Sequence, residues 1–122
     1  MNLEHQKIFD AVTNVEVTVY KTLHLRANGS FVTDAAHAAE SFIELNKYPD
    51  EAIEKFVNHI HVCDLFPDLP EDEYSDIADK IACAWEKELS ALDLRYRVPR
   101  YEGYGPEVTF YLDRTLVGTL GG

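Results

Sequence analysis

The spacing of apolar residues along the chain alternates between a helical period and a strand-like period. Four segments repeat apolar residues at i, i+3 and i+4, which predicts helices with one buried face each. These segments are residues 3–13, 34–46, 50–60 and 71–92. Pro49 indicates a break before the third helix. Glu71, Asp72 and Glu73 would fill the first turn of the last helix, where the helix dipole favours negative charge.

Four shorter segments alternate between apolar and polar residues, as strands with one buried face do. The first covers residues 15–25, in which Lys21 is the exception among the apolar odd positions, and predicts one continuous strand. The others are residues 94–98, 108–112 and 115–120. We expect the order (α)-β-α-α-α-β-β-β in a single domain of residues 1–122. The predicted class is α+β, an antiparallel four-stranded sheet packed on one face by three or four helices.

The predicted helices identify the expected core residues, because an apolar stripe on a helix packs against a sheet or another helix. The stripe of the last helix is Tyr74, Ile77, Ala78, Ile81, Trp85, Leu89 and Leu92. The stripe of the second helix is Ala35, Ala38, Ala39, Phe42 and Leu45. The stripe of the third helix is Ile53, Phe56, Val57 and Ile60.

Charge is distributed unevenly along the chain. The sequence has 22 acidic and 11 basic residues, a formal net charge of −11. Residues 1–92 carry 18 acids against 7 bases, which accounts for the whole excess, and residues 93–122 carry four of each. Nucleic acids and anionic membranes attract basic surfaces, so this charge argues against direct binding to either. It suits a soluble protein, or one whose partner is basic.

The densest acidic stretch leads into the last helix. Between Asp64 and Asp79 the chain has seven acids and no Lys or Arg. Four acids share one stripe of that helix, roughly 4–10 Å apart, which is the order of phosphate spacing along nucleic acid. These are Asp72, Asp76, Asp79 and Glu86, with Asp68 and Glu73 beside them. We interpret the six as a candidate partner-binding face, and an ordinary solvated helix face is the alternative.

The electrically neutral last third of the chain contains a second candidate surface. Arg95 and Arg97 alternate with apolar residues on a predicted strand, and Tyr111 lies on the next. Arg and Tyr concentrate binding energy at protein interfaces, so these three residues are candidates for partner contact. Cross-strand pairing on a solvated sheet face is the competing interpretation.

Cysteine and histidine residues raise two further questions. Cys63 and Cys83 are expected to be free thiols, and Cys83 falls on the acidic stripe of the last helix. His59 and His61 would share one face with Cys63 in a strand, which is a metal-ligand spacing. In the helix predicted for this segment, the two histidines point in nearly opposite directions. We therefore expect no metal site.

Motifs for catalysis are not found in the sequence. It contains no Gly-x-Ser-x-Gly, no phosphate-binding glycine loop and no Cys-x-x-Cys. We expect a protein that is not an enzyme and needs no cofactor. No apolar run approaches the length of a membrane span, and the first residues do not form a secretory signal, so we expect a cytoplasmic location in a bacterial or phage-infected cell.

Small size, acidity and the lack of catalytic motifs make the chain similar to two groups of binding inhibitors. One group is the immunity proteins that neutralise bacterial toxin domains, and the other is the phage inhibitors of host defence, including anti-CRISPR and anti-restriction proteins. The likeness covers composition and size only. The leading hypothesis is therefore an acidic inhibitor that blocks a basic nucleic-acid-binding surface of a nuclease or effector complex. The alternative is an adaptor or homo-oligomeric scaffold, such as a homodimer, that binds through the Arg and Tyr surface.

Overall fold

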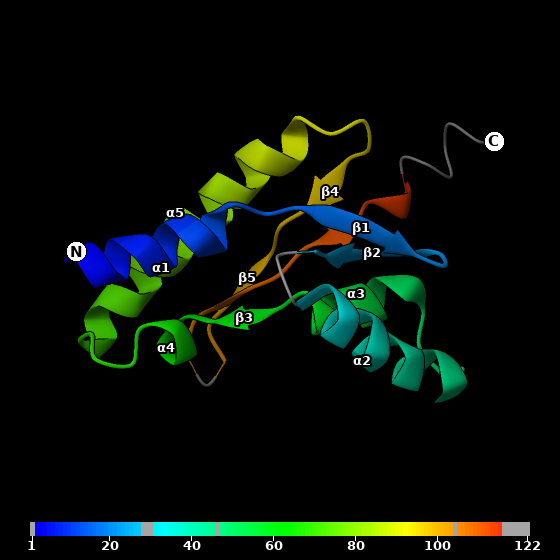
Figure 1. The fold of residues 1–122 in the computed structure, drawn as a ribbon, viewed down its shortest axis with the longest axis horizontal. Coiled ribbons are helices and arrows are strands. Elements are labelled where there is room, and N and C mark those ends of the chain that lie inside the picture. Colours follow the sequence, from blue (N-terminus) through cyan, green and yellow to red (C-terminus); the bar gives the residue numbers. More distant parts are fainter. Residues whose placement is uncertain (1, 28–30, 46, 104, 116–122) are drawn as a thin grey trace.

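The computed structural model describes residues 2–27, 31–45, 47–103 and 105–115, which form five helices and seven short strands (Figure 1). The helices are α1 (Leu3–Thr13), α2 (Phe31–Leu45), α3 (Asp50–Val57), α4 (Val62–Leu65) and α5 (Glu71–Ser90). The strands are β1 (Val17–Tyr20), β2 (Leu23–Arg26), β3 (Ile60–His61), β4 (Tyr96–Arg97), β5 (Arg100–Tyr101), β6 (Glu107–Val108) and β7 (Tyr111–Leu112). Among the described helices, none combines the length and the apolar character needed to cross a membrane.

The segment predicted as one strand over residues 15–25 is instead a hairpin of β1 and β2. The strands pair antiparallel, and Tyr20 lies opposite Leu23. Lys21 in the turn has a φ of 57°, in the left-handed region. The polar residue that interrupted the apolar alternation is therefore the place where the chain reverses. The prediction of a single strand was wrong at this point.

The last described strands form one interrupted antiparallel ribbon, which we call the C-terminal ribbon (residues 95–113). Tyr96 pairs with Leu112 and Tyr101 with Glu107, so both strands keep the same register throughout. The interruption falls at Pro99, which has no N–H to donate, although its carbonyl accepts from Thr109 N at 3.2 Å. The first two strands of the predicted meander form this hairpin, and the third, residues 115–120, falls almost wholly outside the described residues.

The predicted four-stranded sheet is replaced by three smaller antiparallel sheets, β1-β2, β3-β6-β5 and β4-β7. Side chains of α3 occupy the place where β2 and β7 would have to pair. Glu54 accepts hydrogen bonds from His24 N at 2.7 Å and Leu112 N at 3.0 Å. Asn58 accepts from Arg26 N at 2.8 Å. These side chains take up backbone groups that would otherwise bond a neighbouring strand.

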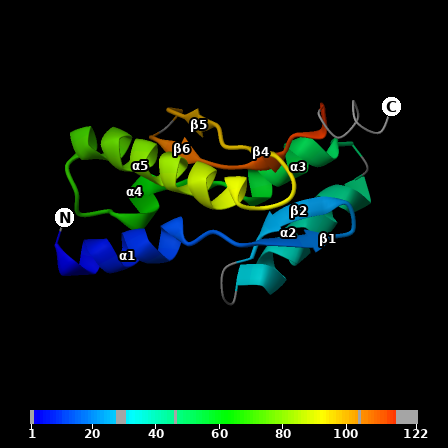
Figure 2. The same cartoon turned by 90° about the horizontal axis from the view of Figure 1, so that it is seen from above.

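The buried apolar residues form two clusters. The large cluster joins α1, α4 and α5 to the C-terminal ribbon, and Trp85 lies within it. Its indole Nε1 donates to Val12 O at 2.8 Å, and its ring meets Phe110 edge-on with centroids 5.8 Å apart. The small cluster lies among β2, α2 and α3 and consists of Leu23, Leu25, Ala39 and Ile53. Figure 2 shows the helices of the two clusters at opposite ends of the molecule.

The predicted apolar faces agree closely with the structure for α5 and only in part for α2 and α3. The predicted α5 stripe is buried except for Leu92, which is exposed beyond the helix end. Phe56 of α3 is 57% exposed, because Glu54 takes an inward position on that helix. On α2, Ala38 and Leu45 are exposed, and Ile43 packs against the small cluster instead.

Helices also contact both faces of the C-terminal ribbon, whereas one covered face was predicted. Successive residues of a strand point to opposite faces. Phe110 packs on Trp85 of α5, while the neighbouring Thr109 donates its hydroxyl to Lys55 O of α3 at 2.7 Å. The ribbon therefore lies between α5 and the end of α3.

Candidate functional site

The acidic stripe predicted on the long helix faces solvent. Asp72, Glu73, Asp76, Asp79 and Glu86 are all exposed, and so is Cys83 in the middle of the stripe. The apolar residues on the opposite side of α5 are buried in the large cluster. The helical period that predicted this arrangement rests on local spacing alone, which explains why it could be read from the sequence.

Basic residues distant in sequence approach part of this stripe. Arg100 of β5 forms an ion pair with Asp79, with Nε and Oδ1 2.7 Å apart, and also contacts Glu102 at 2.8 Å. Lys80 lies 3.1 Å from Asp76 on the same helix. Among the described residues, the structure gives no ion pair to Asp72, Glu73 or Glu86. The unpaired negative charge is therefore concentrated at the two ends of the stripe.

Asp68, the acid before the helix, contacts a different element. Its carboxylate accepts from Nε2 of the buried His5 at 3.0 and 3.1 Å, which fastens α1 to the loop before α5. The hydrogen bond from His5 lowers the pKa of Asp68. The structure thus separates Asp68 from the helix stripe and gives it an internal partner.

The Arg and Tyr residues of the C-terminal ribbon are also partly engaged within the molecule. Arg97 pairs with the buried Asp113 at 2.9 Å. The ammonium of Lys55 lies 4.7 Å from the centroid of the Tyr111 ring. Arg95 is exposed, and it lines a hollow of about 300 Å³ together with Glu86 at the end of the acidic stripe. The two surfaces predicted separately therefore adjoin at the C-terminal end of α5.

A buried polar seam, formed by Glu54, Asn58 and the groups they bond, connects the two clusters. Glu54 is 0% exposed and accepts from Arg114 Nη1 at 2.8 Å as well as from the two backbone amides of β2 and β7. Asn58 Nδ2 donates to His24 O and Phe110 O, each at 3.0 Å. The hydrogen bond to Glu54 raises the pKa of Arg114. These contacts tie residues near both ends of the chain to one helix.

The seam continues through an aromatic pair. His24 Nδ1 and the Tyr96 hydroxyl share a hydrogen bond of 2.8 Å, and the two rings meet edge-on. Burial lowers the pKa of His24 and raises that of Tyr96, because each loses hydration in its charged form. Both residues therefore favour their neutral states in the folded chain.

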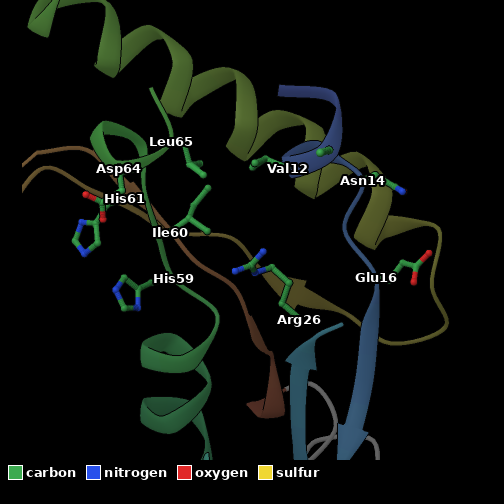
Figure 3. A pocket seen from close by; sticks show the side chains of 10 residues that line it. Val12, Asn14, Glu16, Arg26, His59, Ile60, His61, Asp64 and Leu65 are labelled. Carbon is green, nitrogen blue, oxygen red and sulfur yellow. The ribbon is translucent and has the colours of Figure 1, made fainter. Parts of the chain in front are cut away.

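A pocket of about 660 Å³ opens where the end of β2 meets α1, β3 and α4 (Figure 3). Its apolar lining is Ala11, Val12, Ile60 and Leu65. Its polar lining is Asn14, Glu16, Arg26, His59, His61 and Asp64. Three separate stretches of chain, around residues 11–16, 26 and 59–65, contribute these residues, so no local pattern in the sequence could have predicted the pocket.

The histidines at the edge of this pocket are arranged differently from the sequence prediction. The predicted helix ends before them, and Ile60 and His61 form β3 instead. The rings of His59 and His61 meet edge-on with centroids 4.8 Å apart. His59 Nδ1 donates to Phe56 O, and His61 Nδ1 lies 3.5 Å from a carboxylate oxygen of Glu107. Within the described ranges, no three His, Cys, Asp or Glu residues are grouped closely enough to hold a metal ion.

An aromatic row that the sequence prediction missed runs across α2, α3 and β3. Phe42 contacts Tyr48 and Phe56 with ring centroids 5.5 and 5.0 Å apart, and Phe56 contacts His59 at 5.3 Å. Tyr48 is 49% exposed, and Phe56 is the most exposed ring of the row. Phe56 had been assigned to the core, so the row could be recognised only once the exposed face of α3 was known.

Comparison with protein-family models, characterised proteins and solved structures gives no match to this chain.

Proposed function

We propose that this protein is a binding inhibitor whose acidic face on α5 occupies a basic, nucleic-acid-binding surface of a nuclease or defence effector complex. The observation that carries the proposal is the exposure of Asp72, Asp76, Asp79 and Glu86 on one side of a single rigid helix. From residue 72 to residue 86 the stripe extends about 21 Å along the helix axis. A rigid row of carboxylates costs less ordering on binding than the same charges on a loop.

The ion pairs of the stripe refine which acids would contact the partner. Asp79 is held by Arg100 and Asp76 by Lys80, so their charges are partly compensated within the molecule. Asp72 and Glu86, at the two ends of the stripe, form no ion pair within the described residues. These two positions are the ones where a basic partner would gain most from direct contact.

The experiment compares two variants that carry the same change in net charge. The test variant combines Asp72→Lys, Asp76→Lys and Glu86→Lys and keeps Asp79, because that residue pairs with Arg100. The control combines Glu4→Lys, Asp10→Lys and Glu44→Lys, three exposed acids on α1 and α2. The partner is first identified by pull-down at low and high salt and then purified for titration.

We expect the test variant to bind the purified partner at least about tenfold more weakly at low salt, and to show a smaller dependence on salt. The control variant should lose much less affinity than the test variant, because it changes the net charge equally but leaves the acidic face on α5 intact. The natural chain should also displace a nucleic acid from the partner. Equal affinities for the two variants would mean that the acidic face is not the interface.

An adaptor or homo-oligomeric scaffold is the second candidate, favoured by the exposed aromatic row rather than by Arg97 and Tyr111. Light scattering of the purified chain would show whether it forms a stable dimer. Dissociation by Phe56→Ser would place the interface on the aromatic row, whereas dissociation by Arg95→Glu would place it on the C-terminal ribbon. A monomer at high concentration would remove the homo-oligomeric version.

A further inference from the structure

The pocket at the end of β2 combines an apolar wall with a cation in its interior. Arg26 projects from the end of β2 into the middle of the space, with His59 and His61 to one side of it and Glu16 to the other (Figure 3). Val12 and Ile60, which belong to the large cluster, form part of the apolar wall. The volume of about 660 Å³ is in the range of pockets that hold small organic molecules.

The charges that line the pocket differ in their exposure to water. Arg26 is only partly exposed, and burial lowers the pKa of its guanidinium, since a charged group in apolar surroundings loses hydration. The two acids of the lining, Glu16 and Asp64, are both exposed. The charged group in the middle of the pocket is therefore Arg26, whereas the two carboxylates lie toward solvent.

We propose that this pocket binds a small organic carboxylate with an apolar body, its carboxylate facing Arg26 and its body packed on Val12, Ile60 and Leu65. The planar guanidinium presents N–H donors in a fork that matches the two oxygens of a carboxylate. The apolar wall supplies the burial that a simple inorganic anion would not gain. The ligand site is independent of the acidic face on α5, because the two share no lining residue.

The histidine pair would close the opening of the site on one side. His59 Nδ1 is engaged with Phe56 O, which leaves Nε2 as its remaining polar atom. His61 is positioned by Glu107 of β6. Both rings are tied to the backbone or to a neighbouring strand, so this wall is formed before a ligand arrives and little ordering is needed on binding.

The test uses octanoate as the probe, with octan-1-ol and octylammonium as controls of similar size and different charge. Isothermal titration and amide chemical shifts of the whole chain would measure affinity and location. We expect saturable octanoate binding that is at least about tenfold tighter than binding of either control. Charge-assisted hydrogen bonds from Arg26 to the carboxylate should give about this gain in affinity. The shifted amides should belong to residues near Val12, Arg26 and Ile60.

Two variants separate the charge of the site from its volume. Arg26→Gln should weaken octanoate about tenfold and leave octan-1-ol within about twofold, because only the carboxylate loses its partner. Ala11→Trp, an exposed lining position, should fill the space and weaken both probes. Lys87→Gln removes an exposed positive charge on α5 and should change neither affinity.

Three results would overturn the proposal. They are equal affinity for octanoate and octan-1-ol, chemical-shift changes confined to another surface, and unchanged octanoate binding in a folded Arg26→Gln variant. If Arg26→Gln fails to fold, the comparison of octanoate with its two controls and the Ala11→Trp variant still test the carboxylate site. No loss of octanoate binding in Ala11→Trp would then place the probe outside the pocket.

Discussion

The two apolar clusters of this protein are stabilised in different ways. The large cluster has fourteen described buried residues, seven of them from α5 and the rest from α1, β3, α4, the ribbon and adjoining loops, with Trp85 and Phe110 among them. The small cluster has Leu23, Leu25, Ala39 and Ile53 as its described buried members, with Tyr20, Phe42, Ile43 and Val57 packed partly buried against them. A buried polar seam around Glu54 ties this cluster to the ribbon. Removing the seam should therefore loosen the small cluster first.

This comparison also separates the candidate binding features. The acidic stripe is on α5, which is part of the large cluster and rests on its full apolar face. The aromatic row belongs mainly to α2 and α3, beside the small cluster. A partner of the acidic stripe would meet a helix packed along its length on the large cluster, whereas a partner of the row would meet elements tied to the ribbon through the polar seam.

The largest effect is expected from removing the centre of the large cluster. Trp85→Ala should lower the free energy of unfolding by roughly 3–5 kcal/mol, because it leaves a large cavity and an unsatisfied carbonyl at Val12. Urea denaturation measures the change, and Lys87→Ala on the exposed side of α5 serves as the control. A loss below about 1 kcal/mol would contradict the central place of Trp85 in the large cluster.

The next largest effect should come from the seam. Glu54→Gln keeps the shape of the side chain but removes the negative charge that Arg114 and two backbone amides contact. We expect a loss of about 1.5–3 kcal/mol, with hydrogen exchange rising first in β2 and α3. Glu51→Gln, an exposed change on the same helix, should stay within about 0.5 kcal/mol. Similar losses for both variants would contradict a special role for the seam.

A smaller effect should follow from Tyr96→Phe, which deletes the hydroxyl bonded to His24 and keeps the ring against Phe110. The expected loss of stability is about 0.5–1.5 kcal/mol. The matched control is Tyr101→Phe, because Tyr101 is exposed on β5. Thermal unfolding of the two variants side by side is the measurement, and a larger loss from Tyr101→Phe would reverse the assignment.

The pH dependence of stability offers the mildest test. Burial lowers the pKa of His24, so the unfolded chain takes up a proton at a higher pH than the folded chain does. The neutral ring contributes its full stability at pH values above the ordinary pKa of histidine. This contribution is lost as the pH falls from the ordinary pKa to the lowered pKa of His24 in the folded chain. Urea unfolding at about pH 8 and about pH 5.5 should show a smaller decline for His24→Gln than for the natural chain. Parallel declines would exclude His24 as the source.

Local patterns predicted the helices well and the contacts between them poorly. The stripe of α5 and the exposure of its acids follow from a helical repeat within one segment. The pairing of Arg100 with Asp79 joins residues 21 positions apart, and no local signal indicates it. The pocket also brings together Val12, Arg26 and Ile60, and no local signal in the sequence indicates this arrangement.

The errors in the sheet have a common physical origin. Two-residue strands such as β3 are too short for a period to be read, and Lys21 gave the only sign of the first hairpin. The inward positions of Glu54 and Asn58 were not predicted, because buried polar side chains are uncommon. Their role depends on β2 and β7, which come from distant parts of the sequence.

The position of Glu54 has a consequence for the order in which the chain is made. Its partners are residues 24, 112 and 114, so one is synthesised before α3 and the other two more than fifty residues after Glu54. Until Arg114 leaves the ribosome, burial of the Glu54 carboxylate would lack its counter-charge. The nascent small cluster should therefore stay open and hydrated until Arg114 has emerged.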